Sequence, residues 1–388
     1  MRGKSMWQRL GILPAVFLMI AAVALAVAAA PASAQTNKSK KQASNLREQI
    51  NRGTVGIISG GINGTYIRIA SDLASVLDDG NQLRILPLIG KGSVQNIRDI
   101  LYLKGIDIGI VQSDVLAFLK RQRPHAKIED RIHYITKLYN EELHLVAGPG
   151  VNSVKDLAGK KVNFGNKGSG TYMSSSIIFE KLGIKVQPTS FDQATAVEMT
   201  RKGEIAALVY IVGKPARLFQ EASVQGLKLL PVPQTPEILE VYLPSRFTSE
   251  DYPALVPAGQ EVRTLAVGAV MAVYNWDAKG ERYAKVSRFV DNFFGRFSEF
   301  QQAPRHSKWR EVNLNTEVPG WKRFKAADEW LAKAKVAQRP SLESSFARFL
   351  AEQGPSLRSG GGEAANLDQA KDELFRQFLL WQAKQQSQ

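Results

Sequence analysis

A short unit of strand, glycine-rich turn and helix occurs twice in this chain. The turn of the first copy, residues 59–66, reads SGGINGTY, and the turn of the second copy, residues 165–172, reads GNKGSGTY. Each turn follows a run of strand-forming residues and precedes apolar residues at helical spacing. Strands that alternate with helices favour parallel sheets covered by helices. The two copies therefore predict two α/β lobes, each with a glycine-rich helix start.

The rest of the sequence continues this alternation. Residues 281–302 carry an aromatic stripe at helical spacing, which is typical of core packing. Residues 354–366 contain three consecutive glycines and predict a linker. The expected strands are 54–59, 83–89, 106–111, 161–164, 186–191, 206–212 and 265–273. The expected helices are 66–77, 93–104, 171–182, 194–202, 281–302, 321–337, 342–352 and 367–382.

The first 34 residues have the pattern of a secretory signal peptide. Three basic residues precede residues 10–30, which form an uncharged apolar run, and Ala32-Ser33-Ala34 supplies the small-x-small pattern of a cleavage site. A run of this length could also be a retained membrane anchor. We expect cleavage after Ala34, which leaves a soluble periplasmic protein with a polar tether at residues 35–51.

Composition narrows the possible chemistry. The chain has no cysteine, so it has no disulfide, no thiolate metal site and no lipid attached through cysteine. Removing the signal peptide takes away three basic and no acidic residues, so the formal net charge of +15 falls to +12. A basic surface favours anionic partners. The basic residues are spread along the chain, which does not predict nucleic-acid binding, and a solvated basic surface explains most of them.

The glycine-rich turns point to anion binding. Residues 165–171 superficially resemble a phosphate-binding loop, but the lysine that such a loop needs before its Thr is missing. Free backbone N–H groups, the positive end of a helix and the hydroxyls of Ser169 and Thr171 nevertheless suit a carboxylate or phosphate. A plain turn with a Ser or Thr cap is the structural alternative.

Two further segments have weaker signals. Gly92 and Ser93 open another helix, with Ser93 expected at the N-cap. Gln112 and Asp114 follow a strand at its carboxyl end, where open α/β sheets place ligand contacts. A helix cap is an equally good explanation of Asp114.

Catalysis is not expected. The chain has no Gly-x-Ser-x-Gly elbow and no His-Glu-x-x-His pair, and its four histidines lack metal-ligand spacing. His133 and His144 lie in strand-like runs, which favours structural histidines with satisfied hydrogen bonds. Glu141 and Glu142 are neighbours on such a run and should point to opposite faces. We predict no catalytic residue, no metal and no cofactor.

The chain resembles the TAXI class of TRAP-transporter solute receptors over residues 53–330. The resemblance rests on the opening motif at residues 59–66, on GSVQN at residues 92–96 and on GID at residues 105–107 with IVQSD at residues 110–114. It also rests on residues 154–162, on GSGT at residues 168–171 and on VGKPA at residues 212–216. Ile67 and Arg68 stand where the family often has a second Tyr and a Pro, which leaves the solute open.

This resemblance implies a type II periplasmic-binding-protein fold, with two α/β lobes joined by crossing strands and extra C-terminal helices. Lobe one would comprise residues 52–143 and 265–337, lobe two residues 144–264, and a helical extension residues 338–388. The implied function is delivery of a small anionic solute, an organic acid or amino acid, to an ion-gradient-driven membrane permease of the TRAP type. The alternatives are a ligand-sensing protein that docks on a sensor kinase and a receptor that delivers its solute to an ATP-driven importer. We expect the protein to be a monomer.

We predict that the solute lies between the lobes, held by backbone N–H groups of the helix starts and flanked by the rings of Tyr66 and Tyr172. The predicted ligand-binding residues are Ser59, Asn63, Gly64, Thr65, Tyr66, Gly92, Ser93, Gln112, Asp114, Gly168, Ser169, Gly170, Thr171, Tyr172 and Gly213.

Overall fold

The computed structural model describes residues 42–48, 50–80, 82–219 and 224–338, together with single residues between 346 and 381. The predicted signal peptide, the linker at 354–366 and most of the tail helices lie outside these residues. The chain divides into two units, Met1–Phe324 and Lys325–Gln388. The first unit contains both α/β lobes. Among the described helices, none is long and apolar enough to cross a membrane.

The strands and helices at residues 54–112 follow the order that the sequence predicted for the start of the first lobe. Its parallel strands β1 (Thr54–Ile58), β2 (Arg84–Leu88) and β3 (Ile108–Gln112) alternate with α3 (Thr65–Leu77) and α4 (Ser93–Tyr102). The apolar stripe of α3 is buried because its residues recur at helical spacing. The helices α5 (Val115–Gln122) and α6 (Ile128–Arg131) lead from this lobe into the first crossing strand.

The second lobe repeats the arrangement. Strands β5 (Lys161–Asn163), β6 (Gln187–Thr189) and β7 (Ala207–Val212) pair in parallel and alternate with α7 (Gly170–Lys181) and α8 (Gln193–Arg201). Alternate residues of β7 face two separate apolar clusters, because successive side chains of a strand point to opposite faces. The short elements β8 (Lys228–Leu229), α9 (Pro236–Leu239) and β9 (Leu243–Thr248) complete this lobe.

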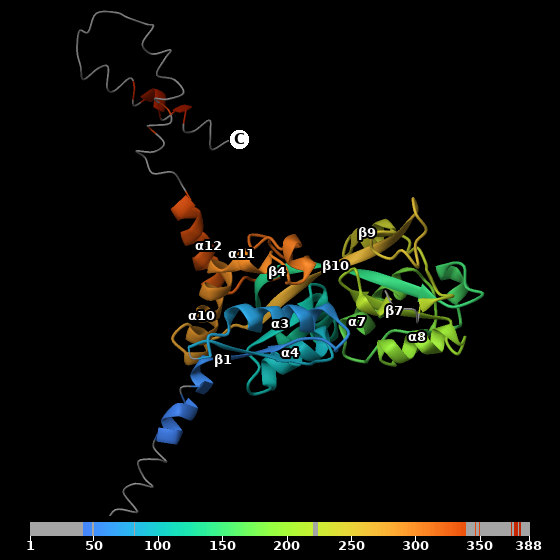
Figure 1. Cartoon of the computed structure of the whole chain (residues 1–388), viewed down its shortest axis with the longest axis horizontal. Coiled ribbons are helices and arrows are strands. Elements are labelled where there is room, and N and C mark those ends of the chain that lie inside the picture. The colour runs from blue at the N-terminus through green and yellow to red at the C-terminus, as the bar shows by residue number, and fades with distance from the viewer. Residues whose placement is uncertain are drawn as a thin grey trace, which may run out of the picture. The chain divides into compact units, whose positions relative to one another are not determined.

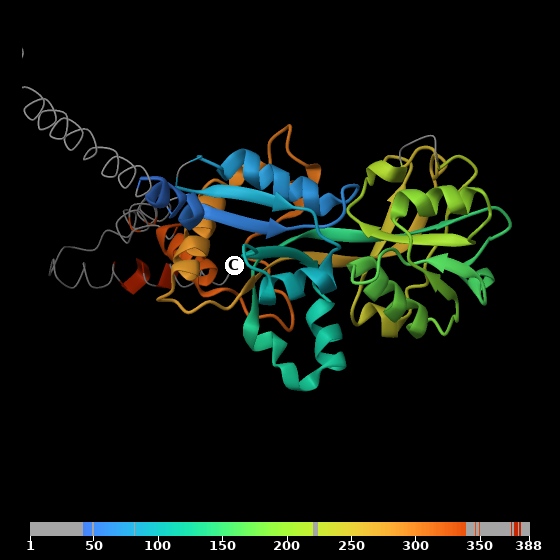
Figure 2. The same ribbon diagram turned by 90° about the horizontal axis from the view of Figure 1, so that it is seen from below.

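Two long antiparallel strands join the lobes. They are β4 (Ile132–Ala147) and β10 (Glu261–Tyr274), and Figures 1 and 2 show both running from one lobe into the other. Within the described residues the sheet order is β2-β1-β3-β10-β4-β7-β5-β6, with β8 beside β4 and β9 beside β10. This topology confirms the predicted fold class of two α/β lobes connected by crossing strands.

Two predicted helices differ from the structure. The helix expected at 281–302 is divided at Arg296 into α10 (Glu281–Gly295) and α11 (Phe297–Phe300), so that Phe293 and Phe300 both contact the ring of Trp309. The helix expected at 321–337 begins later, as α12 (Lys325–Gln338). The segment before α12 is not helical because its backbone pairs with β4: the Tyr134 N–H donates to the Lys322 carbonyl at 3.0 Å, and the Phe324 N–H donates to the Tyr134 carbonyl at 2.7 Å. The Trp321 indole N–H also donates to the Ser113 carbonyl, at 2.8 Å.

The second unit contains α12 and part of the C-terminal tail. Among its described residues the ring of Phe378 lies 5.2 Å from that of Phe346 and 5.8 Å from that of Phe349, measured between centroids. Trp381 also contacts Phe349. The aromatic residues that the sequence placed on one side of the last helix therefore pack against the preceding aromatic pair.

Candidate functional site

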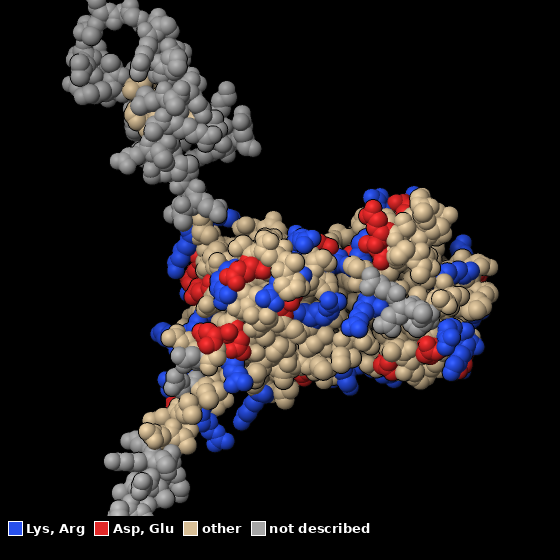
Figure 3. Space-filling view, viewed as in Figure 1, with Lys and Arg blue, Asp and Glu red and all other residues tan. Residues whose placement is uncertain are grey.

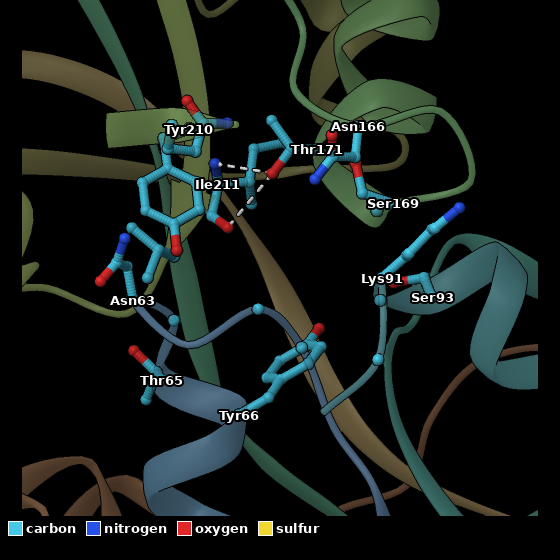
Figure 4. Close-up of a pocket in the computed structure, with 18 of the residues that line it drawn as sticks. Asn63, Thr65, Tyr66, Lys91, Ser93, Asn166, Ser169, Thr171, Tyr210 and Ile211 are labelled. Carbon is cyan, nitrogen blue, oxygen red and sulfur yellow. Dashed lines mark hydrogen bonds between the residues drawn. The ribbon is translucent and has the colours of Figure 1, made fainter. Parts of the chain in front are cut away.

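A cavity of about 430 Å³ lies between the two lobes. The first lobe contributes residues 60–66, residues 89–93 and Gln112, and the second lobe contributes residues around Ser169 and around Tyr210. Glu141, on the crossing strand β4, completes the lining. Figure 4 shows Tyr66 and Tyr210 on one side of this cavity and Lys91, Ser93 and Ser169 on the other.

Three helices begin at the cavity. The N-caps of α3, α4 and α7 are Gly64, Gly92 and Ser169, and all three line the space. The first N–H groups of a helix have no partner within it, and the helix dipole places partial positive charge there. Three such ends from both lobes make the cavity favourable for an anion.

Two glycines let these helix starts approach each other. Gly92 has φ 107°, a left-handed conformation that residues with a Cβ rarely adopt, and a Cβ there would lie 3.4 Å from the Gly170 nitrogen. A Cβ on Gly170 would lie only 2.2 Å from Gln112 Oε1. The Gln95 N–H, in the first turn of α4, donates to the Gly168 carbonyl at 3.0 Å. The lobes therefore contact each other directly beside the cavity.

Ser93 does not act as the predicted N-cap. Gly92 occupies that position, and Ser93 is the first residue of α4. The Ser93 hydroxyl accepts a hydrogen bond from the Gln112 N–H at 2.9 Å, so it ties the helix start to the end of β3. The Gln112 side chain in turn accepts from Ser174 of the second lobe, at 3.1 Å.

The second-lobe turn combines capping with sheet contacts. The Ser169 hydroxyl caps α7 by accepting from the Tyr172 N–H at 3.0 Å, which is the structural alternative that the sequence offered beside solute binding. The Thr171 hydroxyl accepts from the Ile211 N–H at 3.2 Å and lies 3.5 Å from the Ile211 carbonyl. Figure 4 draws both contacts. Thr171 thus links the helix start to β7.

Ten of the predicted site residues line the cavity and five do not. Those in the lining are Asn63, Gly64, Thr65, Tyr66, Gly92, Ser93, Gln112, Ser169, Gly170 and Thr171. The five outside it are Ser59, Asp114, Gly168, Tyr172 and Gly213.

The five residues outside the lining have structural partners instead. The Ser59 hydroxyl donates to the Leu88 carbonyl at 2.6 Å. The Asp114 side chain caps no helix and accepts from Ser174 and Tyr242.

The remaining three belong to the turns and the second-lobe core. Gly168 has φ 91° and accepts from Gln95. The Tyr172 ring packs on the second-lobe core beside Phe164, so it is not the cavity wall that we expected. The Gly213 carbonyl lies 3.5 Å from the Thr65 hydroxyl.

Sequence reasoning missed several lining residues. Glu141 and Tyr210 are the most informative, because both come from strands in the interior of the sheet, and Lys91, Asn166 and Gln193 also belong to the lining. As predicted, Glu141 and its neighbour point to opposite faces: Glu141 accepts from the Tyr66 hydroxyl, and Glu142 accepts from the Lys308 ammonium at 2.9 Å. The available signal was the pair of adjacent carboxylates within a strand whose residues are mostly buried.

The carboxyl of Glu141 has an unusual environment. It is 3 % exposed, and the Tyr66 hydroxyl lies 2.6 Å from its Oε2. Burial raises the pKa of Glu141 to about 8, with a further rise from the nearby Glu142 carboxylate. Burial also raises the pKa of Tyr66 and of Tyr210, and Glu141 adds to both shifts. Burial therefore favours the neutral form of all three groups at this end of the cavity.

Histidines and acidic residues do not form another chemical centre in the described part of the chain. No group of three His, Asp or Glu residues there could hold a metal ion. His144 is the structural histidine that the sequence predicted: its Nε2 lies 2.6 Å from the Tyr252 hydroxyl and its Nδ1 lies 2.9 Å from the Glu142 carbonyl. Lys and Arg side chains are spread over both lobes on the face shown in Figure 3, mixed with Asp and Glu.

The fold and the cavity between its lobes define the two-lobed class typified by periplasmic binding proteins. A model of the NMT1-like family matches residues 57–283, which is more than half of the chain. The chain belongs to the NMT1-like family.

Solved structures with a similar arrangement include one described as a periplasmic transporter, at 12 % identity and TM-score 0.45, and the periplasmic binding protein BugD, at 13 % identity and TM-score 0.44. Each likeness covers 78 % of this chain and 97 % of the other. The periplasmic aliphatic sulphonate binding protein SsuA from Escherichia coli is 16 % identical, with TM-score 0.36 and coverage of 72 % of this chain and 77 % of that one.

Proposed function

We propose that this protein is a periplasmic solute receptor that binds a small anionic solute, an organic acid or amino acid, between its lobes. The observation that carries the proposal is the meeting of three helix N-termini, from both lobes, at one cavity. Each end supplies free N–H groups and partial positive charge where an anion would lie. A cavity of about 430 Å³ suits a small molecule rather than a polymer.

In this proposal the bound solute holds the lobes together. The N–H groups of α4 belong to the first lobe and those of α7 to the second, so an anion between them contacts both. Without the solute these positive ends face each other across the cavity, which favours separation of the lobes. Binding would thus favour the closed form because the solute interacts better with that form than with the open one.

The closed form would then dock on a TRAP-type membrane permease driven by an ion gradient. The motifs shared with TAXI receptors support this partner, and cleavage of the N-terminal segment after Ala34 would release the receptor into the periplasm. In this proposal the receptor carries the solute as a freely diffusing monomer, because the chain has no cysteine to which a lipid could be attached.

Two measurements test the receptor function. A thermal-shift screen of organic acids and amino acids should raise the melting temperature for the bound class, since a ligand of the folded state stabilises it. Small-angle scattering should then show a smaller radius of gyration with that solute present. Saturating binding with an unchanged radius would overturn lobe closure, and the absence of binding by any small anion would overturn the receptor itself.

The permease assignment needs its own test. If a TRAP-type permease is encoded beside this protein, vesicles that contain that permease should accumulate the solute only when the receptor and an ion gradient are both present. Uptake that requires ATP hydrolysis, or a periplasmic kinase domain that captures the closed receptor, would replace the permease with one of the alternatives.

A further inference from the structure

Glu141 is a buried acidic group in a cavity built for an anion. It lines the cavity from β4, where the crossing strand passes between the lobes. The other acidic residue in the described lining, Asp192, is exposed at the rim and caps α8 by accepting from the Thr195 N–H. A buried carboxylate beside a bound anion would repel it. The role of Glu141 therefore depends on its protonation and on the group that the solute brings to it.

No cation neutralises Glu141 in the described part of the structure. The Lys308 ammonium acts on it electrostatically, but that ammonium is bound to Glu142 at 2.9 Å and to Glu311 at 2.8 Å. The one hydrogen-bond partner of the Glu141 carboxyl among the described residues is the Tyr66 hydroxyl, at 2.6 Å. A carboxylate this deeply buried is costly without an ion pair, whereas a protonated carboxyl in the same place is not.

The groups around Glu141 act on its pKa in both directions. Burial and the carboxylates of Glu142 and Asp114 raise the pKa, the Tyr66 hydrogen bond and the Lys308 ammonium lower it, and the net shift is upward. The titratable groups that act on it or are acted on by it come from α3, β4, β7, the N-terminus of α5 and the segment 307–311, and only Lys308 among them is a cation. The titratable groups that interact electrostatically with Glu141 are Tyr66, Tyr139, Glu142, Tyr210, Asp114 and Lys308.

We infer that Glu141 meets the bound solute as a neutral carboxylic acid that donates a hydrogen bond to a solute oxygen. The solute is then an anion rich in oxygen acceptors that carries no ammonium group. This inference rests on the proposed function and narrows its solute class to carboxylates, keto acids or sulfonates. A protonated carboxyl has one donor, so it complements a second oxygen of a solute whose charged end lies at the helix starts.

The same arrangement makes binding depend on one proton. Burial raises the pKa of Glu141 to about 8, so the free carboxyl is mostly protonated at pH 7 and mostly ionised at pH 9. An anion binds only the protonated form well. Its affinity should therefore fall about tenfold between pH 7 and pH 9, because one proton is linked to binding. A solute with an ammonium group would show the opposite trend, since it would favour the ionised carboxylate.

The first test needs no solute. Infrared difference spectra of the wild-type protein and Glu141→Gln at pH 7 should contain a carboxylic-acid C=O band that the variant lacks and that disappears on titration to pH 9. Glu180→Gln, which removes an exposed carboxylate on the second lobe, should leave that band in place. Absence of a Glu141 acid band at pH 7 would overturn the inference for any solute.

The second test uses matched solutes that differ by an ammonium group: 2-oxoglutarate with glutamate, pyruvate with alanine, and ethanesulfonate with taurine. We expect the member without the ammonium group to bind more tightly, with affinity about tenfold lower at pH 9 than at pH 7. Glu141→Gln, which keeps a donor and cannot ionise, should bind with similar affinity at the two pH values. Glu180→Gln should keep the wild-type pH dependence.

The outcomes separate this inference from the proposed function. Tight binding of the ammonium members, lost in Glu141→Gln, would overturn the neutral-acid role while the receptor function stands. If no member of any pair binds and the wider screen of organic acids and amino acids also finds no ligand, the proposed function fails and the narrower solute class fails with it. The infrared spectra then still show whether Glu141 is neutral.

Discussion

The Asp114 carboxylate of the first lobe accepts a hydrogen bond from the Ser174 hydroxyl of the second lobe, at 2.7 Å. The Tyr242 hydroxyl donates to the same oxygen at 3.0 Å. Asp114 and Ser174 are both buried, and neither lines the cavity. This contact therefore joins the two lobes in the closed arrangement without touching the space for the solute.

Replacing Ser174 with Ala should weaken solute binding without removing a ligand contact. The variant also loses the contact of the Ser174 hydroxyl with Gln112 Oε1, which joins the same two lobes. A hydrogen bond to a charged acceptor contributes about 1.5–3 kcal/mol, so loss of these contacts should lower affinity about tenfold or more by opening the lobes. Calorimetry and small-angle scattering on the same sample measure both effects. Ser176→Ala is the matched control, because that hydroxyl donates to the Tyr172 carbonyl within α7, at 2.8 Å, and not across the lobes among the described residues. Equal affinity of Ser174→Ala and wild type would show that the contact does not control closure.

A side chain at Gly170 should hold the lobes apart. The Cβ of Gly170→Ala would lie 2.2 Å from Gln112 Oε1 and 2.5 Å from Ser93 Oγ, both in the other lobe. Affinity should fall at least about tenfold, since closure would require these side chains to move. The backbone of Gly170 is not left-handed, so steric contact between lobes is the cause. Gly295→Ala adds a Cβ in open space on α10 and should bind normally. Normal binding by Gly170→Ala would contradict the closed arrangement of these helix starts.

Thr171→Val tests whether that hydroxyl serves the fold or the solute. The variant leaves the buried Ile211 N–H without its side-chain acceptor, which should reduce the free energy of unfolding by about 1–3 kcal/mol. Thr171→Ser keeps the hydroxyl and should retain most of the stability. Urea denaturation compares the three proteins. A large loss of affinity with unchanged stability would instead support a direct contact between Thr171 and the solute.

His144 should make the fold sensitive to acid. Burial lowers its pKa to about 3, compared with about 6.5 in an unfolded chain. Between these values the unfolded chain binds the extra proton, so the contribution of His144 to the free energy of unfolding decreases as pH falls, by up to about 1.4 kcal/mol per pH unit. Asp114 and Glu141 act in the opposite direction because their pKa values are raised.

Comparison with His144→Asn isolates this contribution. The variant cannot titrate, so urea denaturation between pH 6.5 and pH 4 should show a shallower acid loss than in wild type, by about one proton. Parallel curves for the two proteins would contradict the assignment of a neutral, buried His144.

The sequence alone predicted the elements whose cause is local. Apolar residues at helical spacing fixed α3, and alternating strands and helices predicted both lobes before any contact between them was known. The glycine-rich turns identified the starts of α3 and α7, since a helix start with small residues has a recognisable composition. The place of Ser169 as a cap followed from the same local chemistry.

Tertiary structure decided the contacts between segments far apart in the chain. Ser93 has the sequence of a helix cap, yet its hydroxyl bonds to Gln112 because β3 ends beside it. Asp114 and Tyr172 were expected at the solute. Asp114 instead bonds to Ser174 of the other lobe, and the Tyr172 ring packs against the core of the second lobe. Glu141 was missed for the same reason. Periodicity reports which face of an element is buried, whereas the partner on that face depends on how the strands and lobes meet.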